Sequence, residues 1–124
     1  MMQLAAIAAG GAIGAMLRFW TSTSVHTLFG RAFPYGTLTA NVAGSLLMGI
    51  LYVYFVDRAA LAPEWRAAIL IGLLGAFTTF STFSIETFNL IEQGELFKAA
   101  LNVLLSVGLC LLATAFGVVI GRQI

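Results

Sequence analysis

The sequence predicts an all-α membrane protein with four transmembrane helices, and three observations support this fold class. First, 60% of the 124 residues are hydrophobic and only 9% are charged, whereas about one quarter of the residues of a soluble domain are charged. Second, residues 32–56, 67–85 and 99–121 contain no Asp, Glu, Lys or Arg. Third, each stretch can hold a helix that crosses a bilayer, which needs about 20 mostly apolar residues.

The first predicted helix covers residues 4–29 and is interrupted by Arg18. Its glycines Gly10 and Gly14 form a small-xxx-small pattern, which favours close packing against another helix. A charged side chain within an apolar segment either extends to the membrane interface or lies in an aqueous vestibule. Both interpretations of Arg18 remain open from the residues alone.

The second predicted helix covers residues 35–56, after Pro34, a residue that suits the first turn of a helix. Asn41 lies about two turns into this helix, and its amide can donate two hydrogen bonds. Such a side chain at membrane depth either joins neighbouring helices or serves a functional site. The sequence favours neither interpretation.

The third predicted helix covers residues 64–90 and has an unusual middle. Residues 72–84 contain two glycines and five hydroxyl side chains, where a helix facing lipid would carry leucine. We expect this helix to break between Gly75 and Thr79, because non-helical backbone at membrane depth is tolerated where protein or a cavity satisfies it.

Three phenylalanines, Phe77, Phe80 and Phe83, recur at a spacing of three in the same segment. This spacing predicts that they lie near one face of a helix. Packing is the ordinary explanation, but the positive edges of aromatic rings also suit a small anion. Glu86, about one turn before the end of this apolar run, is either an interface residue or part of a vestibule.

The fourth predicted helix covers residues 96–120 and has polar or polarisable side chains at every fourth position. These side chains lie on one side of the helix. They either line a wet path or, for the hydroxyls, bond back to carbonyls of their own helix. The four positions are Asn102, Ser106, Cys110 and Thr114.

The basic residues are divided equally between the two sides of the membrane. With four spans, both termini lie on one side, and the positive-inside rule then gives no preferred orientation. We therefore expect dual topology and an antiparallel homodimer; the alternative is one orientation set by a different signal. A chain this small also needs a partner to enclose a transport path. The basic residues are Arg58, Arg66 and Arg122 on one side, and Arg18, Arg31 and Lys98 on the other.

Several function classes lack the residues that they need. The net charge of +1 provides no basic patch for nucleic acid. His26 is the only histidine and Cys110 the only cysteine, so neither a Cys/His metal site nor an intrachain disulfide is expected. The sequence has no phosphate-binding loop and no nucleophile beside a base. We expect no enzyme activity.

Three ordered segments resemble the Fluc (CrcB-like) family of fluoride channels. The segments read GAMLRF at 14–19, PYGTLTAN at 34–41 and GAFTTFSTFSIET at 75–87. The resemblance covers nearly the whole chain and implies a dual-topology antiparallel homodimer in the bacterial inner membrane. Such a dimer would export fluoride passively through two pores and thereby relieve fluoride toxicity.

The resemblance also implies roles for individual residues. Asn41 would donate a hydrogen bond to the permeating fluoride, and Phe80 and Phe83 would present their ring edges to it. Thr79 and Ser106 would line the same pore with hydroxyl groups.

Further implied roles concern a cation and the pore entrances. The backbone carbonyls of Gly75 and Thr78 would bind a structural sodium ion at the dimer interface. Arg18 would face an aqueous vestibule and attract anions, and Glu86 lies at the matching acidic position.

Two other functions are compatible with a small protein of four apolar helices. A dual-topology, proton-coupled multidrug exporter would normally carry an acidic residue in the middle of its first helix, but residues 4–29 contain none. A helix-packing subunit of a larger complex would explain the small residues. It would not explain Asn41 together with the hydroxyls of the third helix.

Overall fold

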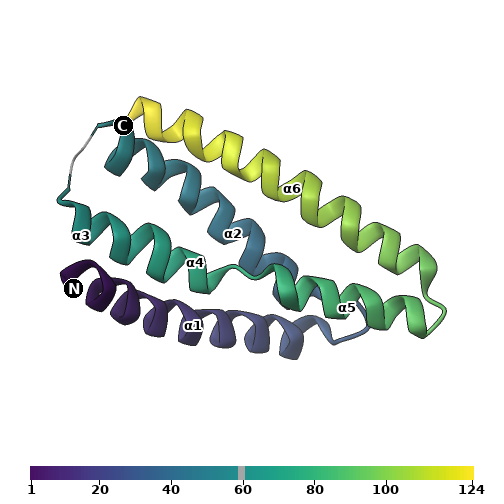
Figure 1. The fold of residues 1–124 in the computed structure, drawn as a ribbon. Helices are drawn as coiled ribbons and strands as arrows, with labels where there is room; N and C mark the ends of the chain where they lie inside the picture. Colours follow the sequence, from purple (N-terminus) through teal and green to yellow (C-terminus); the bar gives the residue numbers. More distant parts are fainter. Residues whose placement is uncertain (59–60) are drawn as a thin grey trace.

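The computed structural model describes residues 1–58 and 61–124, and every regular element within them is helical. Four segments are long and apolar enough to cross a membrane, which confirms the predicted number of spans. They lie side by side along one long axis, with both termini at the same end (Figure 1). The four segments are Met2–Phe29, Tyr35–Asp57, Pro63–Glu92 and Leu96–Gln123.

Two spans are uninterrupted α-helices, whereas the second span ends in a π-helical turn. Arg58, just beyond that turn, donates through Nη2 to the carbonyl of Gly121 at 2.9 Å. This bond joins the ends of the second and fourth spans and satisfies a carbonyl that has no partner within its own helix. The elements are α1 (Met2–Phe29), α2 (Tyr35–Tyr52), η1 (Val53–Asp57) and α6 (Leu96–Gln123).

The third span is divided, as the sequence predicts. Thr78 and Thr79 have extended backbones, with φ/ψ of −88°/159° and −155°/121°. The break therefore lies at the end of the predicted range, and Figure 1 shows it as a short open stretch between two helices. The elements are α3 (Pro63–Arg66), the π-helical η2 (Ala67–Leu73), α4 (Leu74–Phe77) and α5 (Phe80–Glu92).

The prediction that three phenylalanines share one helical face is wrong for Phe77. Phe77 ends α4 and Phe80 begins α5, so the two extended residues between them interrupt the helical phase. Phe80 and Phe83 remain neighbours on α5, with ring centroids 5.2 Å apart. Phe77 is buried on the other side of the break.

Glycines allow the helix backbones to approach one another closely. A Cβ atom at Gly10 would overlap the carbonyl oxygen of Ala68, and one at Gly14 would overlap that of Leu73. The small-xxx-small pattern of α1 therefore packs directly against η2, as expected for membrane helices.

One end of α2 is held by the single histidine, for which the sequence suggested no role. His26 is buried at the end of α1, and its Nε2 atom accepts a hydrogen bond from the Gly36 backbone N–H at 3.2 Å. This N–H belongs to the first turn of α2, where no carbonyl of the helix itself can accept it.

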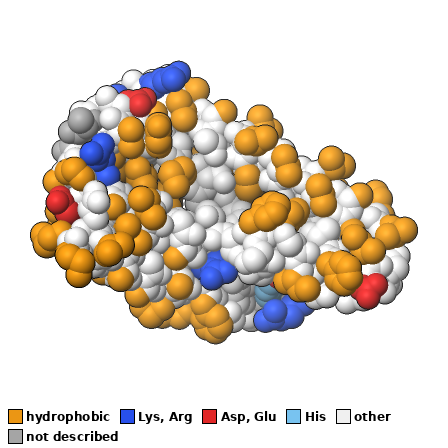
Figure 2. All heavy atoms as spheres, viewed as in Figure 1, with side chains coloured by type: hydrophobic (Ala, Val, Ile, Leu, Met, Phe, Trp, Pro, Cys, Tyr) orange, Lys and Arg blue, Asp and Glu red, His pale blue; other side chains and the backbone are white. Residues whose placement is uncertain are grey.

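The outer surface suits a bilayer rather than water. Leu104, Leu111 and Leu112 of α6 are each largely exposed. Hydrophobic side chains cover much of the visible face in Figure 2, and several of the charged side chains gather at the end that carries the termini. The chain is thus a multi-pass membrane protein.

Candidate functional site

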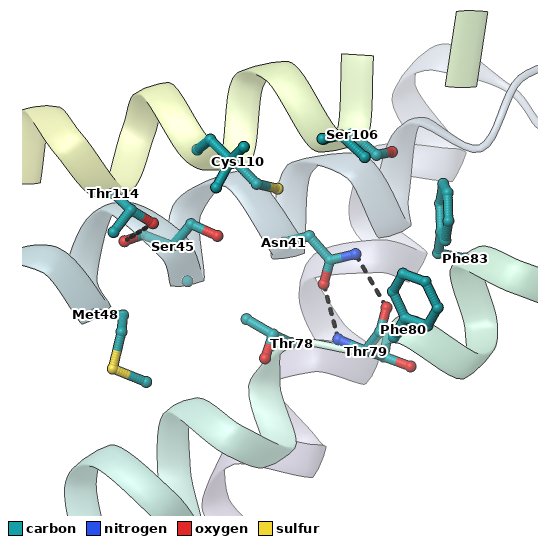
Figure 3. Close-up of a pocket in the computed structure, with 13 residues that line it drawn as sticks. Asn41, Ser45, Met48, Thr78, Thr79, Phe80, Phe83, Ser106, Cys110 and Thr114 are labelled. Atoms are coloured by element: carbon teal, nitrogen blue, oxygen red, sulfur yellow. Dashed lines mark hydrogen bonds between the residues drawn. The ribbon is translucent and has the colours of Figure 1, made fainter. Parts of the chain in front are cut away.

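A cavity of about 410 Å³ lies beside the break in the third span, between α2, α5 and α6. Figure 3 shows its lining side chains, which come from all three helices and from the extended residues. All five residues expected to line a pore contribute to it, although they are up to 65 positions apart in the sequence. They are Asn41, Thr79, Phe80, Phe83 and Ser106.

The Asn41 side chain pairs with the backbone of Thr79 through two hydrogen bonds. The Thr79 N–H donates to Oδ1 at 2.8 Å, and Nδ2 donates to the Thr79 carbonyl at 3.0 Å. In a continuous helix this N–H would donate to the carbonyl of Gly75. Asn41 therefore replaces a helical partner that the break removes, and Figure 3 shows both bonds.

This pairing also determines which atoms of Asn41 can reach a ligand. The Thr79 N–H can only donate, so Oδ1 of Asn41 must face it, and Nδ2 then faces the Thr79 carbonyl. One Nδ2 hydrogen is then used by Thr79, and the other has no partner among the described residues. Asn41 thus acts as interhelical glue and keeps one hydrogen-bond donor at the cavity.

Thr79 caps the N-terminus of α5. Its Oγ1 atom accepts from the Thr82 backbone N–H at 3.2 Å and donates to the Thr82 hydroxyl at 3.1 Å. The first residue of α5, Phe80, lines the cavity. The N-terminus of a helix carries a partial positive charge and unpaired N–H groups, so this end favours an anion.

Sequence reasoning did not identify this helix terminus. The available signal was a threonine directly before an apolar helical run, which is a common N-cap pattern. The pattern becomes meaningful only once the break is located between Phe77 and Phe80.

The two phenylalanines of the site differ in exposure. Phe80 is 75% exposed, whereas Phe83 is only 8% exposed and is held within the bundle. Both rings line the cavity, and Figure 3 shows them next to each other on its α5 side. The positive edges of such rings attract negative charge without contributing a fixed cation.

The polar stripe of α6 is divided by the structure. Ser106, Cys110 and Thr114 line the cavity, but Asn102 does not. Thr114 donates to the carbonyl of Ser45 on α2 at 3.2 Å, so its hydroxyl joins two helices. One interpretation of the stripe is that its hydroxyls bond back to carbonyls of their own helix. Neither Thr114 nor Ser106 does so.

Arg18 and Glu86 lie outside this cavity, in two separate hollows. Arg18 lines a hollow of about 220 Å³ and reaches the site only indirectly, through a 3.4 Å bond from Nη1 to the Thr82 hydroxyl. Glu86 lines a hollow of about 290 Å³ together with Arg31 and Lys98. The structure therefore does not bring either charge next to Asn41.

The break also frees backbone oxygen atoms that fit a small hard cation. The Thr79 N–H is paired with Asn41, so the carbonyl of Gly75 lacks its helical donor. Gly75 is exposed, and a Cβ atom added there would approach only the Leu70 carbonyl, at 3.8 Å. Thr78 follows in an extended conformation, so its carbonyl is also outside the helical pattern.

The sequence matches one known family over most of its length. Residues 5–118 match the family described as CrcB-like protein, Camphor Resistance (CrcB). A "Fluoride-specific ion channel FluC" from Methylococcus capsulatus is 58% identical over 123 residues, which are 99% of this chain and 54% of that protein. The chain therefore spans about half the length of that relative.

Other relatives are matched over their whole length. A "Fluoride-specific ion channel FluC" from Coxiella burnetii is 51% identical over 99% of this chain and 100% of its own length. The protein of that name from Geobacter sulfurreducens is 48% identical, with both chains covered completely.

Proposed function

The chain belongs to the CrcB-like family, and from this membership and the geometry of the cavity we propose that it is a fluoride-selective ion channel. It would let fluoride leave a bacterial cell passively across the inner membrane and so relieve fluoride toxicity. The relatives named as fluoride-specific channels support the choice of ion. The observation that carries the proposal is the Asn41 amide, which is held in position by Thr79 and retains one donor at the cavity.

The residues around the cavity match what fluoride needs in order to lose its water. Selective passage requires groups that replace the hydration shell without holding the ion too tightly. Asn41 and Ser106 offer neutral donors, and Phe80 and Phe83 offer ring edges. None of these side chains carries a full positive charge that would trap the anion.

We further propose that two copies assemble as an antiparallel, dual-topology homodimer with two pores. The equal division of the basic residues supports the two orientations. A single copy leaves Phe80 and Gly75 exposed beside the cavity. A second copy, related by a twofold axis, would cover this surface with its own equivalent.

A structural sodium ion is proposed at the twofold axis of this dimer. The carbonyls of Gly75 and Thr78 would hold it, and the second copy would double the number of oxygen ligands. Unwound backbone carbonyls are known to coordinate sodium in membrane proteins. When bound, the ion would supply positive potential near the pores.

Arg18 and Glu86 are assigned to the water-filled approaches of the pore rather than to its interior. Arg18 lines a hollow beside α5, and Glu86 lines another close to the loop between α5 and α6. A charge at such a position changes the local concentration of anions without contacting the ion in the pore.

Ion efflux from liposomes that contain the purified protein tests the proposed function. We expect fluoride to leave rapidly while chloride stays inside, with a potassium ionophore present to prevent the build-up of voltage. Empty liposomes provide the control. An absence of fluoride flux from folded, dimeric protein would contradict the proposal and would favour the multidrug exporter or the packing subunit.

Replacing either ring with an aliphatic side chain is expected to slow fluoride efflux. Phe80→Ile and Phe83→Ile keep apolar bulk but remove the ring edges, so we expect a loss of about threefold to tenfold. Phe80→Ile should leave the fold of each copy unchanged because this ring is exposed in a single copy, whereas Phe83→Ile should cost about 1 kcal/mol in packing within the copy.

The matched control is Phe116→Ile, which changes an exposed ring of α6 outside the cavity. Efflux is measured for each variant at equal amounts of dimeric protein. Rates equal to that of the parent in both Phe80→Ile and Phe83→Ile would show that these rings serve only packing.

A further inference from the structure

The hydroxyl of Ser106 forms a different bond from the hydroxyls that bond back to their own helix. Five serine and threonine side chains bond back to the carbonyl four residues earlier, with distances of 2.7–3.1 Å. Ser106 could do the same, but it donates instead to the side-chain oxygen of Asn102, at 3.3 Å. The five residues that bond back are Ser22, Thr27, Thr78, Ser84 and Thr87.

The orientation of the Asn102 amide follows from its neighbours. The Thr87 hydroxyl donates its only hydrogen to the Phe83 carbonyl at 2.7 Å, so its oxygen can only accept from Asn102. Nδ2 of Asn102 donates to that oxygen at 2.8 Å. Oδ1 is therefore directed toward Ser106. Asn102 is only 2% exposed, so water does not compete for these bonds.

We propose that Asn102 is a positioning residue for Ser106, which keeps the Ser106 hydroxyl off its own helix backbone and available to an anion in the cavity. The inference rests on the proposed function as a fluoride channel, in which Ser106 lines the pore. Asn102 itself does not line the cavity and would not contact the ion.

The length of the bond explains why this arrangement suits conduction. At 3.3 Å the bond from Ser106 to Asn102 is longer than any of the five bonds to backbone carbonyls, and longer hydrogen bonds are weaker. A passing fluoride ion is a stronger acceptor than a neutral amide, because hydrogen bonds to charged groups are stronger. The hydroxyl can turn to the ion and back again at little cost.

Asn102→Leu has a specific expected effect. Leucine has similar volume but no acceptor, so the Ser106 hydroxyl should bond to the carbonyl of residue 102, as five other hydroxyls of this chain bond to the carbonyl four residues earlier. A donor is then withdrawn from the cavity. We expect the fluoride concentration for half-maximal efflux to rise by roughly threefold to tenfold, the effect of one hydrogen bond.

The test is a double-mutant cycle on fluoride efflux, measured as a function of fluoride concentration. Asn102→Leu and Ser106→Ala should each raise the half-saturating concentration, and the double variant should match Ser106→Ala alone. A merely structural role of Asn102 would not depend on whether Ser106 is present. Val103→Leu, at the next position of α6 and outside the cavity, is the control for adding a leucine.

A second variant keeps the test informative if Asn102→Leu does not assemble. Thr87→Val removes the partner of Nδ2 and loosens the same amide, with little change in volume. It should raise the half-saturating concentration less than Asn102→Leu, and only while Ser106 is present.

Two results would overturn the inference alone. The first is an unchanged half-saturating fluoride concentration in Asn102→Leu, or in Thr87→Val if Asn102→Leu does not assemble. The second is an equal shift of this concentration with and without Ser106. A parent protein that conducts no fluoride would instead overturn the proposed function and, with it, the inference.

Discussion

Asn41→Leu is expected to abolish most fluoride flux and to destabilise the protein at the same time. The substitution removes two hydrogen bonds, at 2.8 and 3.0 Å, and leaves both the N–H and the carbonyl of Thr79 without their partner. An unsatisfied buried group costs about 1–3 kcal/mol, and the lower end applies to these part-buried groups. Losing the remaining Nδ2 donor should in addition lower fluoride flux roughly tenfold to a hundredfold, the effect of one hydrogen bond to an ion.

Asn41→Asp separates the role in conduction from the role in folding. An ionised carboxylate still accepts from the Thr79 N–H but has no hydrogen to donate, and a protonated carboxyl uses its only hydrogen on the Thr79 carbonyl. In both states no donor faces the cavity. This variant should therefore fold better than Asn41→Leu and still conduct little fluoride.

Fluoride efflux and thermal unfolding in detergent are measured for both variants. Thr39→Leu serves as the control, because Thr39 lies on the same helix, is exposed and does not line the cavity. Fluoride flux close to that of the parent in Asn41→Asp would contradict the role of Asn41 as a donor. Unchanged thermal stability in Asn41→Leu would contradict its role in holding the break.

The second large effect is expected where α2 and α6 touch. A Cβ atom at Gly49 would overlap the carbonyl oxygen of Thr114, and one at Gly117 would overlap that of Leu46. Both obstacles are backbone atoms, which cannot move aside without separating the helices. Gly49→Val or Gly117→Val should therefore cost more than about 3 kcal/mol, which is much of the stability of a small domain.

The same change would disrupt the site, because these two helices carry Asn41 and Ser106, which both line the cavity. We expect little or no monodisperse dimer for either glycine variant in size-exclusion chromatography. Gly108→Val is the matched control, since an added Cβ at Gly108 meets no atom within 4 Å. A Gly49→Val protein as stable as Gly108→Val would show that the helices do not pack this closely.

Much of the fold could be predicted from the sequence because the bilayer restricts what a chain can do. Charge-free segments had to cross as helices, since lipid offers no partner for exposed backbone groups. The break was predictable for the same reason: glycine and hydroxyl residues in place of leucine indicated backbone that is not in contact with lipid. The four spans and the break at Thr78 and Thr79 agree with this reasoning.

Side-chain periodicity was less reliable once the helix was interrupted. Phe77, Phe80 and Phe83 keep their spacing in the sequence, but the extended Thr78 and Thr79 change the direction in which Phe77 lies. The four-residue stripe of α6 is a true helical face, yet its first member, Asn102, is covered by α5 and bonds to Thr87. The spacing of side chains predicts which residues share a face of one helix, but it does not predict which neighbouring helix covers that face.

The sequence by itself determined the spans and the break, because these depend on local composition and on the bilayer. The five residues expected to line a pore followed from the resemblance to a known family, and all five line the cavity. Only the tertiary structure decided what each polar group is paired with. Asn41 meets Thr79 across 38 positions, and Arg18 and Glu86 enter separate hollows. Hydrogen bonds depend on distance and direction between atoms of different helices, and these are set only when the helices pack.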